Sequence, residues 1–508
     1  MSLNNLPAEV LHQILGYFCI HCSQRPSEES PDAYLQETDQ KSDQPSWYSL
    51  QRHVLFSVCL TSRRLFSIAQ PVLYHEFVLG YGDSWRSDHY TWHGRLTSFM
   101  MAVAQRRDLA KVVKRVYIHP YLLESLHGTD HPRESFNTRS PRTYITDKEA
   151  GLAIRALAAA VKADKPRRWK PGDLVSLLLA ALPNLNRCSF QLAPGHEEIV
   201  RAIPLSAAGV TDLPLRTLDI SQRLSWREND PFSFEPRMRA LFNVAPNLEA
   251  LNLHACRLIE CTSYAPFLAN LKYLRMIRDR SRGHSLKDLL SSCTSLRSFT
   301  YESALYHGPT STPEDNFQLH HVVECLRSSQ ETLESVHIDL KWRGLLRPGA
   351  REPATPSFRD FPALKYLLVN LEEFQSSPLA DAEILPPFLP PNIECVQFPG
   401  RLDHFQIVFP RTRQKKLVFG LAEAVAQGDF PNLKEIRCED DLTPTDAEAI
   451  SSRFAAVEVD FGYKLWPSTT PTLDDADESD LPPMFLPPTE NYLPNMGHPL
   501  PDENEPDL

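Results

Sequence analysis

Glycine is scarce in this sequence, and the glycine-rich motifs of nucleotide-binding and hydrolytic enzymes are missing. Only 18 of the 508 residues are glycine, against 43 prolines. We find no P-loop, no GxGxxG fingerprint and no GxSxG nucleophile motif. Few glycines also argue against phosphate-cradling loops and tight-turn barrels, whereas many prolines suggest stiff loops. The sequence therefore predicts a non-catalytic chain that uses no cofactor.

Long hydrophobic runs are also missing. The longest apolar candidates, such as residues 175–182, fall far short of the roughly 20 residues that cross a bilayer. The N-terminus, MSLNNLPAEV, has no basic segment and reaches Glu9 before any apolar run, so it does not predict a signal peptide. The ten cysteines are scattered, which favours reduced thiols. We expect a cytoplasmic or nuclear protein, or one present in both compartments, with no membrane partner.

The net charge of −11 comes from the C-terminal end of the chain. Residues 467–508 contain ten acids and no Lys or Arg, which leaves 54 acids against 53 bases in the first 466 residues. A nearly neutral body gives no reason to expect nucleic-acid binding. The tail is acidic and rich in proline, so we expect it to be disordered.

Three helices are predicted near the N-terminus. Residues 6–18, LPAEVLHQILGYF, place their apolar side chains on one stripe, which predicts a helix that starts at Pro7. Residues 23–46 are polar and are interpreted as a disordered loop. A second helix is expected around residues 50–59, and a third after the candidate N-cap Thr61, ending at Pro71.

One pattern recurs eleven times from about residue 110 onward, with mostly aliphatic residues at i, i+3 and i+5. From the unit at Leu185 to the unit at Phe454 the spacing varies between 21 and 40 residues, around the period of leucine-rich repeats. Each unit predicts a short strand whose i+3 and i+5 residues point inward. The eleven triplets are Val113/Val116/Ile118, Leu185/Cys188/Phe190, Leu215/Leu218/Ile220, Leu248/Leu251/Leu253, Leu271/Leu274/Met276, Leu296/Phe299/Tyr301, Leu333/Val336/Ile338, Leu364/Leu367/Val369, Ile393/Val396/Phe398, Leu433/Ile436/Cys438 and Phe454/Val457/Val459.

Segments with helix-like apolar spacing lie between these strands. Residues 95–466 are therefore predicted to form an α/β solenoid with a parallel, concave sheet, interrupted by surface loops at 124–148 and 344–359. Unrelated α/β elements are the alternative, because the periods vary and most units lack an asparagine ladder. The predicted helices cover residues 173–182, 238–245, 285–293, 321–328, 416–427 and 446–455.

The N-terminal segment resembles an F-box. The family's motifs occur in order, as Leu6, Pro7, Glu9, Val10 and Leu11, then Leu55, Val58 and Cys59, then Thr61, Arg63, Arg64 and Phe66. The polar insertion at 23–46 departs from the family pattern. The resemblance implies a three-helix F-box over residues 1–77, followed by leucine-rich-repeat-like units, as in substrate receptors of SCF-type cullin-RING ubiquitin ligases. It also implies that the helices dock on a Skp-type adaptor, and through it on a cullin, while the repeats hold an unknown target protein.

Eight apolar residues in the predicted helices are candidates for adaptor contacts or for the core of the helical domain. A small three-helix domain with a wide apolar stripe leaves a hydrophobic patch exposed, and such patches usually bind a partner. A helical cap that only closes the end of the solenoid is the alternative. The eight residues are Leu6, Pro7, Val10, Ile14, Leu15, Leu55, Val58 and Leu65.

Candidates for target binding come from strand alternation, which places residues i+2 and i+4 of each unit on the concave face. Tyr and Arg contribute strongly to interface energies, so we select Tyr273, Arg275, His337, Tyr366 and Arg437. An ordinary solvated sheet face is the alternative. A non-degradative interaction scaffold is the second hypothesis for function.

The spacing of Cys19 and Cys22 resembles half of a zinc or redox site, with His12 nearby. Zinc needs four ligands, and the sequence shows no matching second pair. We therefore interpret this pair as structural or incidental and predict no metal site.

Overall fold

The computed structural model describes residues 3–19, 21–22, 47–78, 95–118, 147–163, 173–192, 200, 202–222, 234–254, 268–279, 283–303, 318–340, 356–370, 374, 379–398, 411–438 and 444–463. The predicted insertion at 23–46, the predicted tail and most of the two predicted surface loops lie outside these residues.

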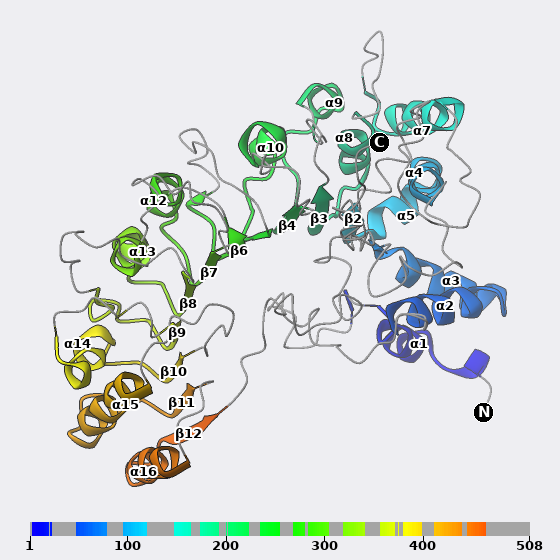
Figure 1. The fold of residues 1–508 in the computed structure, drawn as a ribbon. Coiled ribbons are helices and arrows are strands. Elements are labelled where there is room, and N and C mark those ends of the chain that lie inside the picture. Colours follow the sequence, from blue (N-terminus) through cyan, green and yellow to red (C-terminus); the bar gives the residue numbers. More distant parts are fainter. Residues whose placement is uncertain are drawn as a thin grey trace, which may run out of the picture.

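Across the described residues, twelve parallel strands form one sheet, and each strand pairs with its neighbours in sequence order. The strands line the inner side of an arc, and helices lie along its outer side (Figure 1). A sheet built in sequence order is the architecture of an α/β solenoid, so this prediction is confirmed. The strands are β1 (Glu76–Val78), β2 (Arg115–Ile118), β3 (Arg187–Leu192), β4 (Thr217–Gln222), β5 (Ala250–His254), β6 (Tyr273–Asp279), β7 (Ser298–Ser303), β8 (Ser335–Asp339), β9 (Tyr366–Val369), β10 (Cys395–Phe398), β11 (Glu435–Cys438) and β12 (Asp460–Tyr463).

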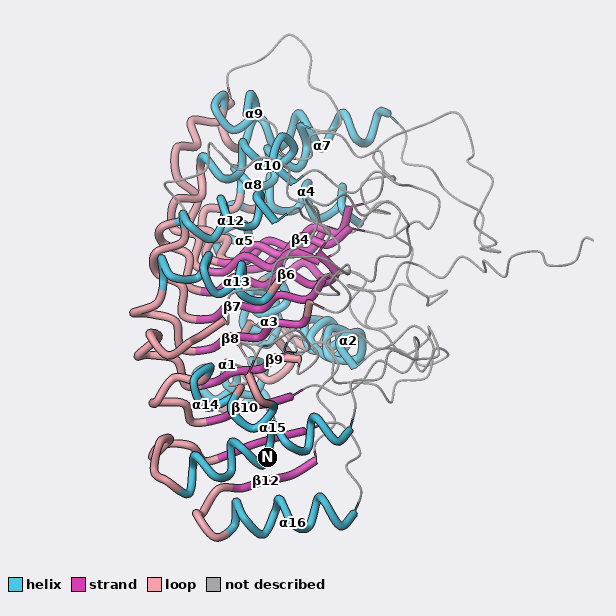
Figure 2. Tube along the Cα trace, turned by 60° about the vertical axis from the view of Figure 1, so that its left-hand side comes forward, coloured by secondary structure: helices cyan, strands magenta, loops and turns pink. Residues whose placement is uncertain are grey.

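Helices connect most of these strands, and all six helices predicted within the solenoid are present. In Figure 2 the strands form one continuous stack with helices alongside it. The helices of the solenoid are α4 (Arg95–Gln105), α5 (Arg107–Val112), α7 (Asp147–Ala160), α8 (Asp173–Ala181), α9 (Ala202–Ala207), α10 (Phe234–Asn243), α12 (Gly283–Ser292), α13 (Leu319–Leu326), α14 (Leu385–Phe388), α15 (Arg411–Ala426) and α16 (Pro444–Ala455).

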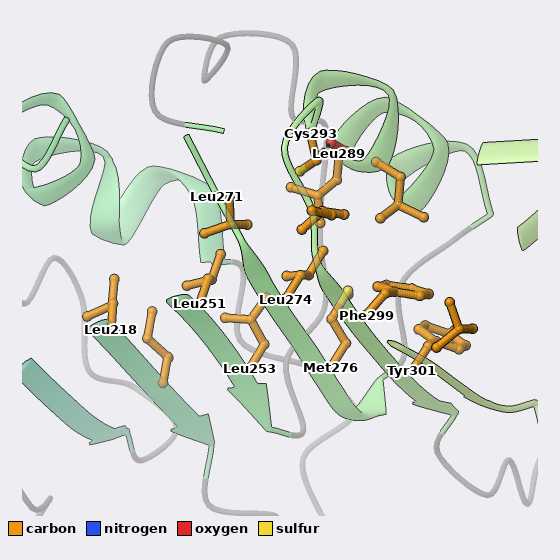
Figure 3. Close-up of a cluster of buried hydrophobic side chains, with 14 of the residues drawn as sticks. Leu218, Leu251, Leu253, Leu271, Leu274, Met276, Leu289, Cys293, Phe299 and Tyr301 are labelled. Carbon is orange, nitrogen blue, oxygen red and sulfur yellow. Dashed lines mark hydrogen bonds between the residues drawn. The ribbon is translucent and has the colours of Figure 1, made fainter. Parts of the chain in front are cut away.

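The inward positions of the first ten predicted units form the core. Every i+3 and i+5 side chain from Val116 to Cys438 is at most 2% exposed. Figure 3 shows members of this set, from Leu218 to Tyr301, side by side on neighbouring strands. Burying one such side chain contributes about 1.5–3 kcal/mol. Strand alternation therefore predicted the core face correctly for these ten units.

The two ends of the sheet differ from the prediction. The unit at Phe454 was assigned four residues too early, because Phe454 belongs to α16 and the strand β12 pairs Phe461 with Ile436. Glu458, with φ 59°, forms the left-handed turn that separates that helix from the strand. The first strand, β1, has no aliphatic triplet; its inward Phe77 stacks on Phe99 of α4 instead.

A regular hydrogen-bond ladder holds the strand starts together. The carbonyl of Lys272, for example, accepts the backbone N–H groups of Arg297 and Ser298, and equivalent pairs recur from His75 to Glu394. Asparagine side chains in the turns that precede three of the strands add further bonds between units: Asn184 donates to the Lys111 carbonyl, Asn270 to the Pro246 carbonyl and Asn392 to the Pro362 carbonyl. These bonds hold the starts of neighbouring strands in register.

Three helices precede the sheet: α1 (Ala8–Gly16), α2 (Trp47–Cys59) and α3 (Arg63–Tyr74). Their core is separate from that of the solenoid and includes Leu11, Leu55 and Ile68. The N-cap of α3 is Ser62, not Thr61, and its side chain accepts the Leu65 N–H. The helix also continues past Pro71, because the buried stripe extends to Val72.

The end of the predicted surface loop at 344–359 lies in the core instead. Phe358 is fully buried and makes edge-to-face contacts with Phe361 and Phe388, at centroid distances of 5.0 and 5.4 Å. The sequence around Phe358 is polar and rich in proline, so it predicted a surface loop and did not indicate that Phe358 is buried.

Candidate functional site

Exposed apolar side chains are concentrated on the N-terminal helices. Seven of the nine exposed large hydrophobic residues in the described part of the chain lie between Leu3 and Phe66. The side chains of Val10 on α1 and Phe56 on α2 are 37% and 51% exposed. Leu60 and Tyr17, at the ends of these two helices, are exposed further. Scattered apolar residues are normal on a surface, but their concentration on one small unit makes that unit a candidate for partner binding.

The structure separates the eight predicted adaptor residues into two groups. Leu15, Leu55 and Leu65 are buried in the core of the helical unit. Pro7 and Val10 are exposed, and the remaining three, Leu6, Ile14 and Val58, are partly buried. Only the exposed and partly buried members can contact a partner directly. Their role as adaptor contacts stays a prediction.

Two arginines hold the helical unit together and join it to the sheet. Arg64 Nη2 donates to the Leu6 carbonyl at 2.5 Å, which ties the start of α3 to the segment before α1. Arg52 of α2 donates to the Leu73 carbonyl and, at 3.2 Å, to the Glu76 carbonyl in β1. One basic residue of the F-box-like motif, Arg64, therefore has a structural role here.

A polar network covers part of the sheet face opposite the core. The Asp219 carboxylate accepts hydrogen bonds from Arg187, Ser189 and Asn252 on the two flanking strands. Burial raises the pKa of Asp219, but the charge of Arg187 and the hydrogen bonds from Arg187, Ser189 and Asn252 outweigh it and hold that pKa below its ordinary value. These side chains are committed to one another, so this part of the face is rigid and polar.

The five predicted target-binding residues differ widely in exposure. Tyr366 is 50% exposed and Tyr273 is partly buried, whereas Arg275 is only 8% exposed. Arg437 forms ion pairs with Glu435 at 2.8 Å and Asp460 at 2.6 Å, and His337 Nε2 lies 3.5 Å from a carboxylate oxygen of Glu302.

Residue i+4 of each unit was expected to face solvent on the concave side of the sheet. This expectation is wrong for Arg275, which is buried. In an in-register parallel sheet, equivalent side chains of adjacent strands stand only about 4.8 Å apart, so long polar side chains pack along the sheet. Tyr366 offers the largest free surface of the five. Target binding by all five stays a prediction.

A charged column that the sequence analysis did not consider lies at position i+1, just before the strands. Glu249 lies between Arg216 and Lys272, with N–O distances of 3.8 and 3.2 Å. Glu394 lies between Lys365 and Lys434 in the same way, at 3.4 and 2.6 Å. The alternation of charge along this column was readable from the sequence once the register was known.

The chain also brings His75 to the Cys19–Cys22 pair that the sequence analysis set aside. The Sγ atom of Cys22 lies 3.1 Å from His75 Nδ1, and that of Cys19 lies 3.7 Å from it. A hydrogen bond between the two thiols, reinforced by burial, raises the pKa of Cys19 to about 12, and the same bond lowers the pKa of Cys22. His75 is therefore supplied from 56 residues beyond Cys19, whereas a second histidine, His21, lies beside Cys22 in the sequence, with its Nδ1 atom 3.6 Å from the Cys22 Sγ atom.

Comparisons with known proteins add little to these observations. No protein-family model and no curated protein sequence matches the chain. An internalin from Listeria monocytogenes is similar at 13% identity over 74% of this chain and 92% of its own, with a TM-score of 0.29. A leucine-rich-repeat protein of Leptospira interrogans is similar at 12% identity over 56% of this chain and 91% of its own, with a TM-score of 0.18. Since these scores are low, the solenoid assignment rests on the strand order and register of the chain itself.

None of the described helices combines the length and the apolar character that a membrane span requires.

Proposed function

We propose that this chain is the substrate-recognition subunit of an SCF-type ubiquitin ligase. In this proposal the helices α1 to α3 dock on a Skp-type adaptor, and the sheet face of the solenoid holds a target protein. The chain itself contributes positioning, because a target held on the solenoid has a high effective concentration near the ubiquitin-charged enzyme.

The observation that carries the proposal is the exposed apolar surface on a helical unit that has its own core. Leu11 and Leu15 fill that core, yet Val10 and Phe56 still point to solvent. A cap that only closed the end of the solenoid would bury such residues against the sheet. The F-box-like order of motifs over the same helices supports an adaptor as the partner.

Affinity purification of the tagged full chain tests the proposal. The double variant Val10→Asp/Phe56→Asp should lose the adaptor and the cullin, with binding weakened by at least about tenfold, because each substitution would bury an unpaired charge in an apolar interface and tenfold corresponds to only about 1.4 kcal/mol. Leu152→Asp is the matched control, since Leu152 on α7 is 44% exposed but lies in the solenoid. That control should bind the adaptor like the wild type.

The outcomes distinguish the two hypotheses for function. Recovery of adaptor and cullin with the wild type and the control, but not with the double variant, supports the receptor. Adaptor without cullin supports the non-degradative scaffold. Absence of any adaptor from the wild-type purification contradicts both the docking face and the ubiquitin-ligase proposal.

A further inference from the structure

Four side chains with metal-binding atoms converge where the helical unit meets the sheet. The ligand atoms of Cys19, His21, Cys22 and His75 all lie within 4.8 Å of one another. Cys19 is buried and the other three are partly buried. We propose that these residues bind one zinc ion as a closed structural site.

The distances fit a tetrahedral site. Zinc bonds of about 2.3 Å to sulfur and 2.0–2.1 Å to nitrogen place neighbouring S and N ligands about 3.6 Å apart in a tetrahedron. The Sγ–Nδ1 distances are 3.7 Å for Cys19 and His75, 3.6 Å for Cys22 and His21, and 3.1 Å for Cys22 and His75. These three pairs are therefore within about 0.5 Å of the tetrahedral spacing, which is a shift that side-chain rotation can supply.

The backbone already holds the ligands in place. The Cys22 N–H donates to the Cys19 carbonyl at 3.1 Å, which forms a tight turn just after α1. His75 is the residue between α3 and β1, and its carbonyl accepts the Lys114 and Arg115 N–H groups at the start of β2. Its ring lies edge-on to that of His21, with 5.3 Å between centroids. A preformed geometry of this kind reduces the ordering cost of binding.

The donor set selects zinc over the hard cations. Two thiolates and two imidazoles suit zinc, whereas calcium and magnesium prefer oxygen ligands. Binding displaces one proton from each cysteine thiol, so two thiolates and two neutral imidazoles around Zn²⁺ leave the site with no net charge. Four protein ligands leave no open position, which makes the site structural and not catalytic.

The consequence is a clamp between α1 and the first strand of the sheet. Without the metal, the polar contacts between the end of α1 and His75 are thiol–imidazole hydrogen bonds, which are weak and add little to the shared apolar core of α1 and α3. With the metal, coordination bonds to one ion would join the end of α1 to the residue that precedes β1. This inference does not rest on the proposed adaptor docking, and either can fail without the other.

The test is metal analysis of the full chain purified without chelators, followed by cobalt substitution of the stripped protein. We expect one zinc ion per chain and, with Co²⁺, the absorption of a tetrahedral site with thiolate charge transfer. Cys22→Ser and His75→Ala should weaken zinc binding by at least about 100-fold. Matched controls are Cys59→Ser, in the core of the same helical unit, and His12→Ala, exposed on α1; both should keep the metal.

Three results would overturn the proposal. The first is wild-type protein that has no stoichiometric zinc and gives no tetrahedral cobalt spectrum. The second is a Cys19–Cys22 disulfide in protein alkylated at lysis. The third is a Cys22→Ser variant that retains a full zinc ion. Because the wild-type spectrum and the disulfide assay need no variant, misfolding of a mutant does not leave the question open.

Discussion

Replacing Asp219 by asparagine should destabilise the solenoid by about 1.5–3 kcal/mol at pH 7. Its Oδ2 accepts hydrogen bonds from Arg187 Nε at 2.7 Å and Ser189 Oγ at 2.6 Å. Its Oδ1 accepts from Arg187 Nη2 at 3.1 Å and Asn252 Nδ2 at 2.6 Å. An asparagine has one carbonyl oxygen, so in its best orientation the new amide donates to Ser189 and faces one guanidinium N–H that has lost its acceptor. Losing a hydrogen bond to a charged group costs about 1.5–3 kcal/mol.

The pH dependence of this difference follows from the sign of the pKa shift. The pKa of Asp219 in the folded protein is lower than the value of about 3.9 expected in the unfolded chain. Such a carboxyl contributes stability that is fully present above the unfolded pKa and is lost as the pH falls through the folded pKa. Wild type and variant should therefore differ fully at pH 7 and converge progressively below about pH 4.

Urea unfolding followed by circular dichroism at these pH values measures the difference. Asp360→Asn is the matched control, because Asp360 is exposed and lies 3.8 Å from Arg327; it should cost less than about 1 kcal/mol. The reasoning is refuted if Asp219→Asn behaves like this control at pH 7. It is equally refuted if the gap between wild type and variant is the same at acid pH.

Three further predictions concern packing and the exposed face. Gly420→Ala would push a Cβ into the Ala382 carbonyl and should destabilise the protein by about 1–3 kcal/mol. Gly151→Ala, whose Cβ would meet nothing closer than 3.9 Å, should instead stabilise it by up to about 1 kcal/mol. Stability changes of the same sign for the two variants in thermal unfolding would contradict this prediction. Phe358→Ala should cost about 3–5 kcal/mol in urea unfolding, and a near-neutral result would argue against its buried position. Tyr366→Ala should change stability by less than about 0.5 kcal/mol but reduce target capture in crosslinking, and unchanged capture would exclude it as a contact.

The repeating part of the fold was predictable because its information is local. An inward side chain at i+3 or i+5 depends only on strand alternation, so Leu251 and Ile436 could be placed without knowing any neighbour. The prediction of strand positions fails where a strand lacks the aliphatic triplet or where the triplet lies outside the strand. At β1 an aromatic Phe77 replaces the aliphatic triplet, and at β12 the turn at Glu458 shifts the strand by four residues.

The candidate site was less predictable, because exposure and convergence are properties of the tertiary structure. Val10 and Leu15 occupy the same amphipathic helix, and only the packing of α3 on α1 decides that the second is core. Arg275 was selected for solvent exposure, yet neighbouring strands enclose it. Likewise, no second pair of cysteines follows Cys22 in the nearby sequence. Cys22 contacts His75 because α3 leads the chain back to the end of α1, and the local sequence does not show this path.

The junction between the helical unit and the sheet determines whether the proposed receptor can position a target. Only His75 separates the end of α3 from the start of β1, and Arg52 bonds to carbonyls on both sides of it. A connection of one residue, pinned from a second helix, leaves little freedom for rotation. In the proposed receptor, α1 to α3 and the first strands would therefore keep one orientation, and this orientation would set the geometry between adaptor and target. A zinc ion at Cys19, His21, Cys22 and His75 would add a third link at the same point. Losing it should loosen target positioning before it unfolds either part, because each part has a core of its own.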